Sequence, residues 1–141
     1  MSILGVYFGE KHTYRDWKLR WTDVDIGYPE AKISTIEVPG SSAVIDLTET
    51  LTGKVEYGAR EITLKFETRE RNYFEWEKLK SKIANYLHGK KMQIKLDTDP
   101  DNFYTGRVKV SFEKSEKERG EITITATCEP FKTDSEGVKS L

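Results

Sequence analysis

The chain reads VPGSSAVIDLTE over residues 38–49, GKVEYG over 53–58 and REITLKF over 60–66. Pro39-Gly40 is a strong turn signal, because proline presets one backbone angle and glycine tolerates positive φ. The flanking arms carry the apolar and β-branched residues that are typical of strands. No residue in this stretch offers catalytic chemistry. The stretch therefore predicts a β-hairpin over about residues 38–58 that projects from the domain and pairs with a neighbour.

Much of the remaining chain alternates apolar and polar residues with a period of two. This alternation predicts antiparallel strands with one buried and one solvated face. Gly106 lies among the inward residues of its strand, which predicts a bulge or a close backbone approach. Residues 99–102, Asp-Pro-Asp-Asn, fit a type I turn between two strands. The expected core residues of these strands are Leu64, Phe66, Ile94, Leu96, Val108, Val110, Ile122 and Ile124.

The N-terminal part of the chain is less regular. The alternation of Trp17, Leu19 and Trp21 predicts one strand, and the nearly apolar segment 3–8 predicts another. Residues 23–29 are rich in turn formers and predict a loop. Basic residues lie near both tryptophans, a pattern that single-strand nucleic-acid binders also use. The alternation favours tryptophans in the core and basic residues in water.

One helix is expected from Asn72 to His88. Asn72 suits the N-cap, Glu75 takes the capping-box position, and Gly89 suits the C′ position. We interpret His88 as positive charge at the negative end of the helix dipole. Phe74 lies on the polar face of the helix; a large exposed aromatic side chain there is often incidental, and the alternative interpretation is a contact surface. The stripe expected to pack on a sheet consists of Trp76, Leu79, Ile83, Tyr86 and Leu87.

Composition bounds the function. The 141 residues suit one domain, and although 33% of them are charged the net charge is only −1. This balance gives no electrostatic case for a nucleic-acid or anionic-membrane partner. The apolar runs are too short to span a bilayer, and residues 1–5 show no secretory signal. Cys128 is the only cysteine, so it is interpreted as a core thiol of a protein made in a reducing cytosol.

Candidate chemistry is sparse. Residues 97–101 have the spaced acids of a calcium loop, but its sixth and twelfth positions fall on Asn102 and Val108 instead of a glycine and an acid. His12 lies in a polar stretch, where we expect an exposed histidine. The sequence shows no phosphate loop, paired cysteines or catalytic triad signature. It therefore predicts no catalytic residue, no metal site and no cofactor.

The order of motifs along the chain resembles the N-terminal domain of the distal tail protein of long, flexible-tailed bacteriophages. The resemblance covers most of the chain. It departs at Ala43, where related sequences often have a second turn glycine. The motifs that carry it are Pro39-Gly40, Ile45-Asp46-Leu47-Thr48, Tyr57-Gly58-Ala59-Arg60, the strand over 62–66, the helix with Trp76 and Gly89, and Thr127 to Phe131.

This resemblance implies a mainly β, tail-tube-like fold: a β-sandwich of two sheets with one flanking helix and a long projecting hairpin. The domain would span residues 1–131, followed by a polar mobile tail over 132–141. The resemblance further implies a hexameric ring at the distal end of the tail. That ring would join the tail tube to baseplate or tip proteins and let DNA pass through its lumen. The protein would be made in the host cytoplasm and reside in the virion tail.

The same resemblance and the hairpin pattern together suggest a subunit interface. Two other classes of function remain as alternatives: a carbohydrate- or host-receptor-binding β-sandwich and a small enzyme. Longer distal tail proteins add a receptor-type domain after the region that matches Phe131, so we do not expect that role here. The predicted interface residues are Pro39, Gly40, Val44, Ile45, Asp46, Leu47, Tyr57 and Phe74.

Overall fold

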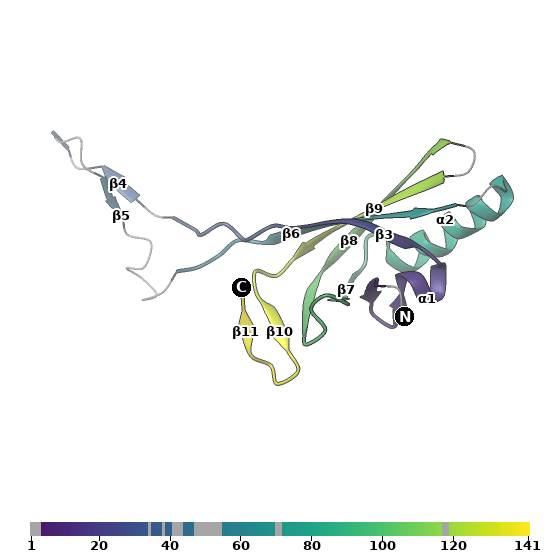
Figure 1. Ribbon diagram of the computed structural model, residues 1–141. Helices are drawn as coiled ribbons and strands as arrows, with labels where there is room; N and C mark the ends of the chain where they lie inside the picture. The colour runs from purple at the N-terminus through teal and green to yellow at the C-terminus, as the bar shows by residue number, and fades with distance from the viewer. Residues whose placement is uncertain are drawn as a thin grey trace.

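The computed structural model describes residues 4–33, 35–37, 39–40, 44–46, 55–69, 72–116 and 119–141. In this part of the chain strands predominate, with one long helix and one short helix (Figure 1). The elements are β1 (Val6–Phe8), β2 (Lys11–His12), α1 (Thr13–Trp17), β3 (Arg20–Ile26), β4 (Thr35–Glu37), β5 (Val44–Asp46), β6 (Arg60–Thr68), α2 (Tyr73–Leu87), β7 (Lys91–Leu96), β8 (Asn102–Glu116), β9 (Arg119–Cys128), β10 (Lys132–Asp134) and β11 (Lys139–Ser140).

The strands form one main antiparallel sheet in the order β2-β1-β7-β8-β9-β6-β3. The mainly β, antiparallel prediction is therefore confirmed. The expected stack of two separate sheets is not confirmed, because the hydrogen-bonded path through the main sheet is continuous. Strands β4 and β5 form a separate two-stranded sheet. A period of two shows which face of a strand is buried but not whether its neighbours belong to one sheet or two.

The core lies between one face of this sheet and α2. Seven of the eight residues expected in the core are buried, and Val110 is half-buried. The helix stripe is also confirmed: Trp76, Ile83 and Leu87 are buried, and its other members pack against the same core. Tyr86 fixes the helix to the first strand, because its hydroxyl donates to the Phe8 carbonyl at 2.8 Å.

The predicted ends of α2 match the structure. The Asn72 Oδ1 atom accepts the backbone N–H of Phe74 at 2.8 Å, as an N-cap should. Gly89 has a φ of 78°, which suits its place after the last turn. His88 has a further contact that the sequence does not predict: its Nδ1 accepts the backbone N–H of Val110 at 3.2 Å.

Two expectations for the N-terminal part are wrong. Residues 13–17 form α1, so Trp17 and Leu19 do not belong to a strand with Trp21. Lys18 ends α1 in the left-handed region (φ 56°), and this reversal buries both Trp17 and Leu19 despite the change of element. The segment expected as a loop over 23–29 instead continues β3 as far as Ile26, because it pairs with β6.

The C-terminal segment is a hairpin where the sequence predicts a mobile polar tail. Strand β10 pairs with β8 and with β11. Lys132 Nζ contacts Asp99 Oδ2 at 2.8 Å and joins this hairpin to the turn before β8. The Asp99 pKa is lowered, first by the Lys132 hydrogen bond and then by the one from Asn102. The contacts that join this segment to the rest of the domain are long-range, so its polar composition does not reveal them.

Gly106 makes the close approach that its position predicts. A Cβ atom added at Gly106 would stand 2.6 Å from both Cys128 Sγ and the Thr127 carbonyl oxygen. The register of β8 and β9 runs unbroken here, pairing Gly106 with Cys128. The glycine therefore serves close backbone packing and not a bulge.

Candidate assembly surface

A long arm projects from the sheet and ends in strands β4 and β5 (Figure 1). The two strands pair antiparallel, with Thr35 opposite Asp46 and Glu37 opposite Val44. Pro39 and Gly40 lie between the strands and are exposed, and Gly40 has a φ of 77°. A glycine at this angle avoids the steric cost that other residues meet.

The sequence predicted a hairpin at this place, but its first strand begins earlier than expected. It predicted a hairpin over about 38–58, whereas the strand before the Pro39-Gly40 turn is β4, at residues 35–37. Its partner β5 contains Val44, Ile45 and Asp46 from the predicted interface. Leu47, also predicted there, lies outside the described residues.

The stem of the arm continues from β3 and returns to β6. Ala31 and Tyr57 form an isolated antiparallel bridge. The backbone N–H of Lys32 donates to the Glu56 carbonyl at 2.7 Å, and that of Gly58 donates to the Glu30 carbonyl at 2.9 Å. The Tyr57 ring meets Phe131 edge-to-face with 5.7 Å between centroids. Tyr57 therefore lies at the root of the arm and packs against its own chain, away from β4 and β5.

Arg60 anchors the point where the arm returns to the sheet. Its side chain is 1% exposed and lies near two rings, 5.5 Å from the Tyr28 centroid and 5.4 Å from that of Tyr104. Its Nη2 donates to the Leu141 carbonyl at 2.7 Å. The buried Nε has no hydrogen-bond partner in the described part of the chain. A buried charge is costly unless it is compensated, and the two rings provide cation–π compensation here.

A groove of about 400 Å³ lies at the root of the arm, between the stem and the adjacent ends of β7, β8 and β9. Its charged lining residues are Lys32, Lys91, Arg107 and Glu129. Three bases and one acid give this lining a net charge of +2. Lys91 Nζ and Glu129 Oε1 are 3.9 Å apart, and both side chains are more than half exposed, so their pairing is weak.

Cys128 also lines this groove but offers no reactive thiolate. Its side chain is 2% exposed, and burial raises its pKa from 9.0 to about 11. Nucleophilic chemistry requires the thiolate, so this thiol is inert near neutral pH. The prediction of a buried core thiol agrees with this geometry.

Phe74 is remote from the arm. It is 81% exposed in the first turn of α2, beside Tyr73, which is 60% exposed. Figure 1 shows α2 at the end of the domain opposite to β4 and β5. The structure therefore divides the predicted interface residues among three places: the end of the arm, its root, and the start of α2.

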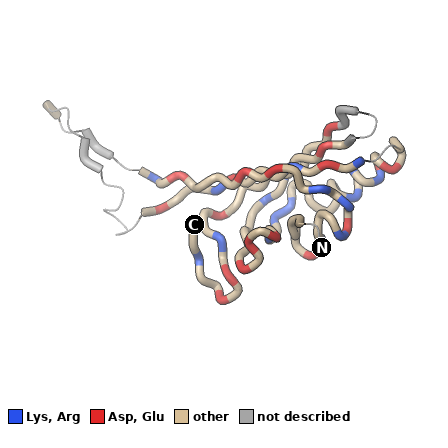
Figure 2. The backbone as a smooth tube through the Cα atoms, in the orientation of Figure 1, with Lys and Arg blue, Asp and Glu red and all other residues tan. Residues whose placement is uncertain are grey.

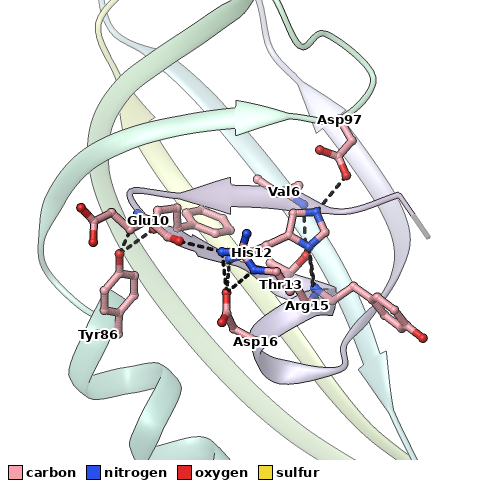
Figure 3. A network of polar contacts seen from close by, with 10 residues as sticks. Val6, Glu10, His12, Thr13, Arg15, Asp16, Tyr86 and Asp97 are labelled. Atoms are coloured by element: carbon pink, nitrogen blue, oxygen red, sulfur yellow. Dashed lines mark hydrogen bonds and ion pairs between the residues drawn. The ribbon is translucent and has the colours of Figure 1, made fainter. Parts of the chain in front are cut away.

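His12 is the polar residue that the sequence most clearly misplaced. It was expected to be exposed, yet it is only 6% exposed and caps α1 (Figure 3). Its Nδ1 accepts the backbone N–H groups of Tyr14 at 3.2 Å and Arg15 at 3.1 Å. Nδ1 therefore carries the lone pair, and Nε2 donates to Asp97 Oδ2 at 2.8 Å.

Asp16 completes this network from the other side of the cap. Its Oδ2 accepts the backbone N–H of His12 at 2.8 Å, and this bond is the first cause of its lowered pKa. His12 and Asp16 thus form a reciprocal pair similar to a capping box, except that the acid lies four residues after the cap. That spacing was the available signal for a short helix at this place.

No group of three potential metal ligands occurs among the described residues. In the same part of the chain, no helix is long and apolar enough to cross a membrane.

Comparison with known proteins identifies the fold. The family described as "Phage tail protein RIFT-related domain" matches residues 18–128. The chain belongs to this family. The resemblance seen in the motifs is thereby confirmed, and the chain is a phage tail protein. No curated protein matches it.

A solved structure agrees with this assignment. The fold is similar to that of the Dit protein (gp 19.1) of SPP1, with a TM-score of 0.76 and 12% identity. That crystal structure is described as a paradigm of the hub adsorption apparatus in phages that infect Gram-positive bacteria. The match covers 94% of this chain and 53% of the SPP1 protein, so the chain spans about half of that protein's length.

Proposed function

We propose that this tail protein forms a hexameric ring at the distal end of a long phage tail. The ring joins the tail tube to the baseplate or tip proteins. Its role is structural and non-enzymatic. Membership of the phage tail family and the similarity to SPP1 Dit support this proposal.

The observation that carries the proposal is the projecting arm. A two-stranded hairpin is marginally stable in water by itself. Strands β4 and β5 nevertheless lie at a distance from the core of the domain (Figure 1). A neighbouring subunit would supply the contacts that a lone hairpin lacks. If the arm of each copy contacts the next copy, the interface is heterologous. Repeating such a head-to-tail contact closes into a ring when the rotation between neighbours is suitable.

The charge distribution suits a ring through which DNA passes. Figure 2 shows acidic and basic residues interspersed along the chain, and the net charge of the sequence is −1. Tight DNA binding requires many phosphate contacts from Lys and Arg, which would hold DNA in transit. In this account the protein is made and assembled in the host cytoplasm and resides in the virion tail.

The native mass of the protein tests this proposal. Native mass spectrometry and sedimentation velocity across about 1–100 µM should show a hexamer, and negative-stain images should show rings. A protein that stays monomeric at every concentration and binds glycans on an array would instead support a receptor-binding module and would overturn the ring.

A further inference from the structure

We propose that the groove at the root of the arm binds a small sugar or polyol that carries a phosphate group. The groove of about 400 Å³ is lined by the stem and by the adjacent ends of β7, β8 and β9. This volume is at the lower end of the range for small-molecule sites. A nucleic-acid strand needs a continuous basic track along its backbone, so a short groove suits a small ligand better.

Two like charges face each other on the strands that line this groove. Lys91 on β7 lies directly opposite Arg107 on β8, and both side chains are exposed. Like charges directly opposite on neighbouring strands destabilise a sheet. Lys32 on the stem adds a third positive charge to the same lining. An anion bound among these three side chains would relieve their repulsion.

The basic side chains are available to such an anion. Neither Lys32 nor Arg107 forms an ion pair with an acid among the residues that the structure describes, and the contact of Lys91 with Glu129 is long, at 3.9 Å. Arg107 Nη1 donates to the Gly89 carbonyl at 2.8 Å. This bond holds the guanidinium in place and leaves its other N–H donors for a ligand. An arginine held in this way suits phosphate or carboxylate oxygens.

The net charge of the lining favours phosphate over carboxylate. A phosphate monoester carries a charge of about −1.5 to −2 at neutral pH, which matches the net +2 of the charged lining residues. A carboxylate carries a single negative charge and would leave about half of the positive charge uncompensated. The ligand is therefore expected to carry one phosphate group.

The other polar residues of the lining suit hydroxyl groups on the same ligand. Thr105, Thr127 and Tyr57 supply hydroxyls, which both donate and accept hydrogen bonds. The Tyr57 ring is positioned by its edge-to-face contact with Phe131. An ionised Glu129 only accepts, so it would bind a ligand hydroxyl and repel a second anionic group. This pattern disfavours a protein segment with several acidic side chains.

Calorimetric titration of the full chain with glucose 6-phosphate tests this site. The comparison probes are glucose, glucuronate, inorganic phosphate and a hexaglutamate peptide. Glucose 6-phosphate should bind at least roughly tenfold more tightly than each of them, because it alone combines a doubly charged group with several hydroxyls.

Variants of the lining assign the binding to the groove. Lys32→Gln and Lys91→Gln should each weaken glucose 6-phosphate binding by roughly tenfold, since each removes a bond to a charged group. The matched control is Lys95→Gln with Lys109→Gln, two exposed lysines on β7 and β8 outside the lining, and it should bind within about twofold of the parent. Glu129→Ala should reduce the preference for glucose 6-phosphate over inorganic phosphate. Circular dichroism should show the parent fold in every variant.

Several results would overturn this site. One is a parent that binds none of the probes at about 10 mM. Another is equal affinity for inorganic phosphate, which would indicate a plain anion site. Tighter binding of the hexaglutamate peptide would indicate a site for an acidic protein segment, and equal loss of binding in the control variant would place the ligand elsewhere. None of these results bears on the ring, which the native mass of the parent tests separately.

Discussion

The His12 network allows a sharp test of how the N-terminal segment is held. His12→Ala removes an N-cap that accepts two backbone N–H groups and a hydrogen bond to Asp97. Loss of a cap costs about 1 kcal/mol. Loss of a bond to a charged group costs about 1.5–3 kcal/mol. We therefore expect the free energy of unfolding to fall by about 3 kcal/mol, a large part of a total of about 5–15 kcal/mol.

His12→Asn separates the two contributions. Asparagine is a strong N-cap residue, but its side chain is too short to keep both the cap and the contact with Asp97. Asp97 would retain the backbone N–H of Gly5, at 2.9 Å. We expect this variant to lose about 2 kcal/mol, less than the alanine variant.

Urea unfolding followed by tryptophan fluorescence measures both effects. Trp17 ends α1, is 3% exposed and lies 5.8 Å from the Tyr86 ring, so it reports on this region. With a slope of about 2 kcal/mol per molar, the alanine variant should shift the midpoint down by about 1.5 M. A free energy of unfolding of His12→Ala within about 0.5 kcal/mol of the parent's would refute the stabilising role of the His12 hydrogen bonds. An asparagine variant as unstable as alanine would refute the capping role.

Three further predictions concern the sheet. Gly106→Ala should lower the free energy of unfolding in urea by about 2 kcal/mol, because the added Cβ would lie 2.6 Å from a backbone oxygen and from Cys128 Sγ. Gly58→Ala is the matched control, since the nearest atom to its added Cβ would be 3.8 Å away. As pH rises from 9 to 11, the Cys128 thiol loses its proton in the unfolded state before it does so in the native state, so the free energy of unfolding should fall by up to about 2–3 kcal/mol. The fall should be smaller in Cys128→Ala, and an equal dependence of stability on pH in the two proteins would contradict this prediction. Ile94→Asp should unfold the domain, whereas Val110→Asp at a half-buried site should only lower its melting temperature; equal effects would count against the observed burial.

Regular periodicity made much of the fold predictable. Leu64, Ile94 and Ile124 lie on strands whose alternation agrees with their burial, and the Asn72 cap and Gly89 define α2 by local chemistry. These features depend on neighbours in sequence, so sequence alone reveals them.

Features that depend on distant contacts were not predictable. His12 is buried because Asp97, far away in the sequence, supplies a partner for its ring. The segment after Phe131 forms a hairpin because β8 offers it an edge and Arg60 contacts Leu141. Trp17 alternates with Leu19 as a strand would, yet the reversal at Lys18 gives the same burial with another backbone.

The projecting hairpin was predictable from the sequence, but its bounds were not. The Pro39-Gly40 turn identified the arm, and Asp46 was placed on it. The start of the arm before Thr35 was not predictable. The stem there is held by backbone hydrogen bonds such as that from the Gly58 N–H to the Glu30 carbonyl, and backbone bonds leave no signal in the side-chain sequence. The groove at its root also escaped prediction, since Lys32 and Arg107 meet only through the fold.

Removal of the arm tests the central claim most directly. Residues 35–54 are replaced by a short Gly-Ser linker, which keeps the Ala31–Tyr57 bridge at the root. Sedimentation velocity and circular dichroism are then compared for the parent and the deletion variant at equal concentration. We expect a ring for the parent and a folded monomer for the deletion variant. A deletion variant that forms the parent's oligomer would contradict the assembly role of the arm, and an unfolded one would show that the arm belongs to the core.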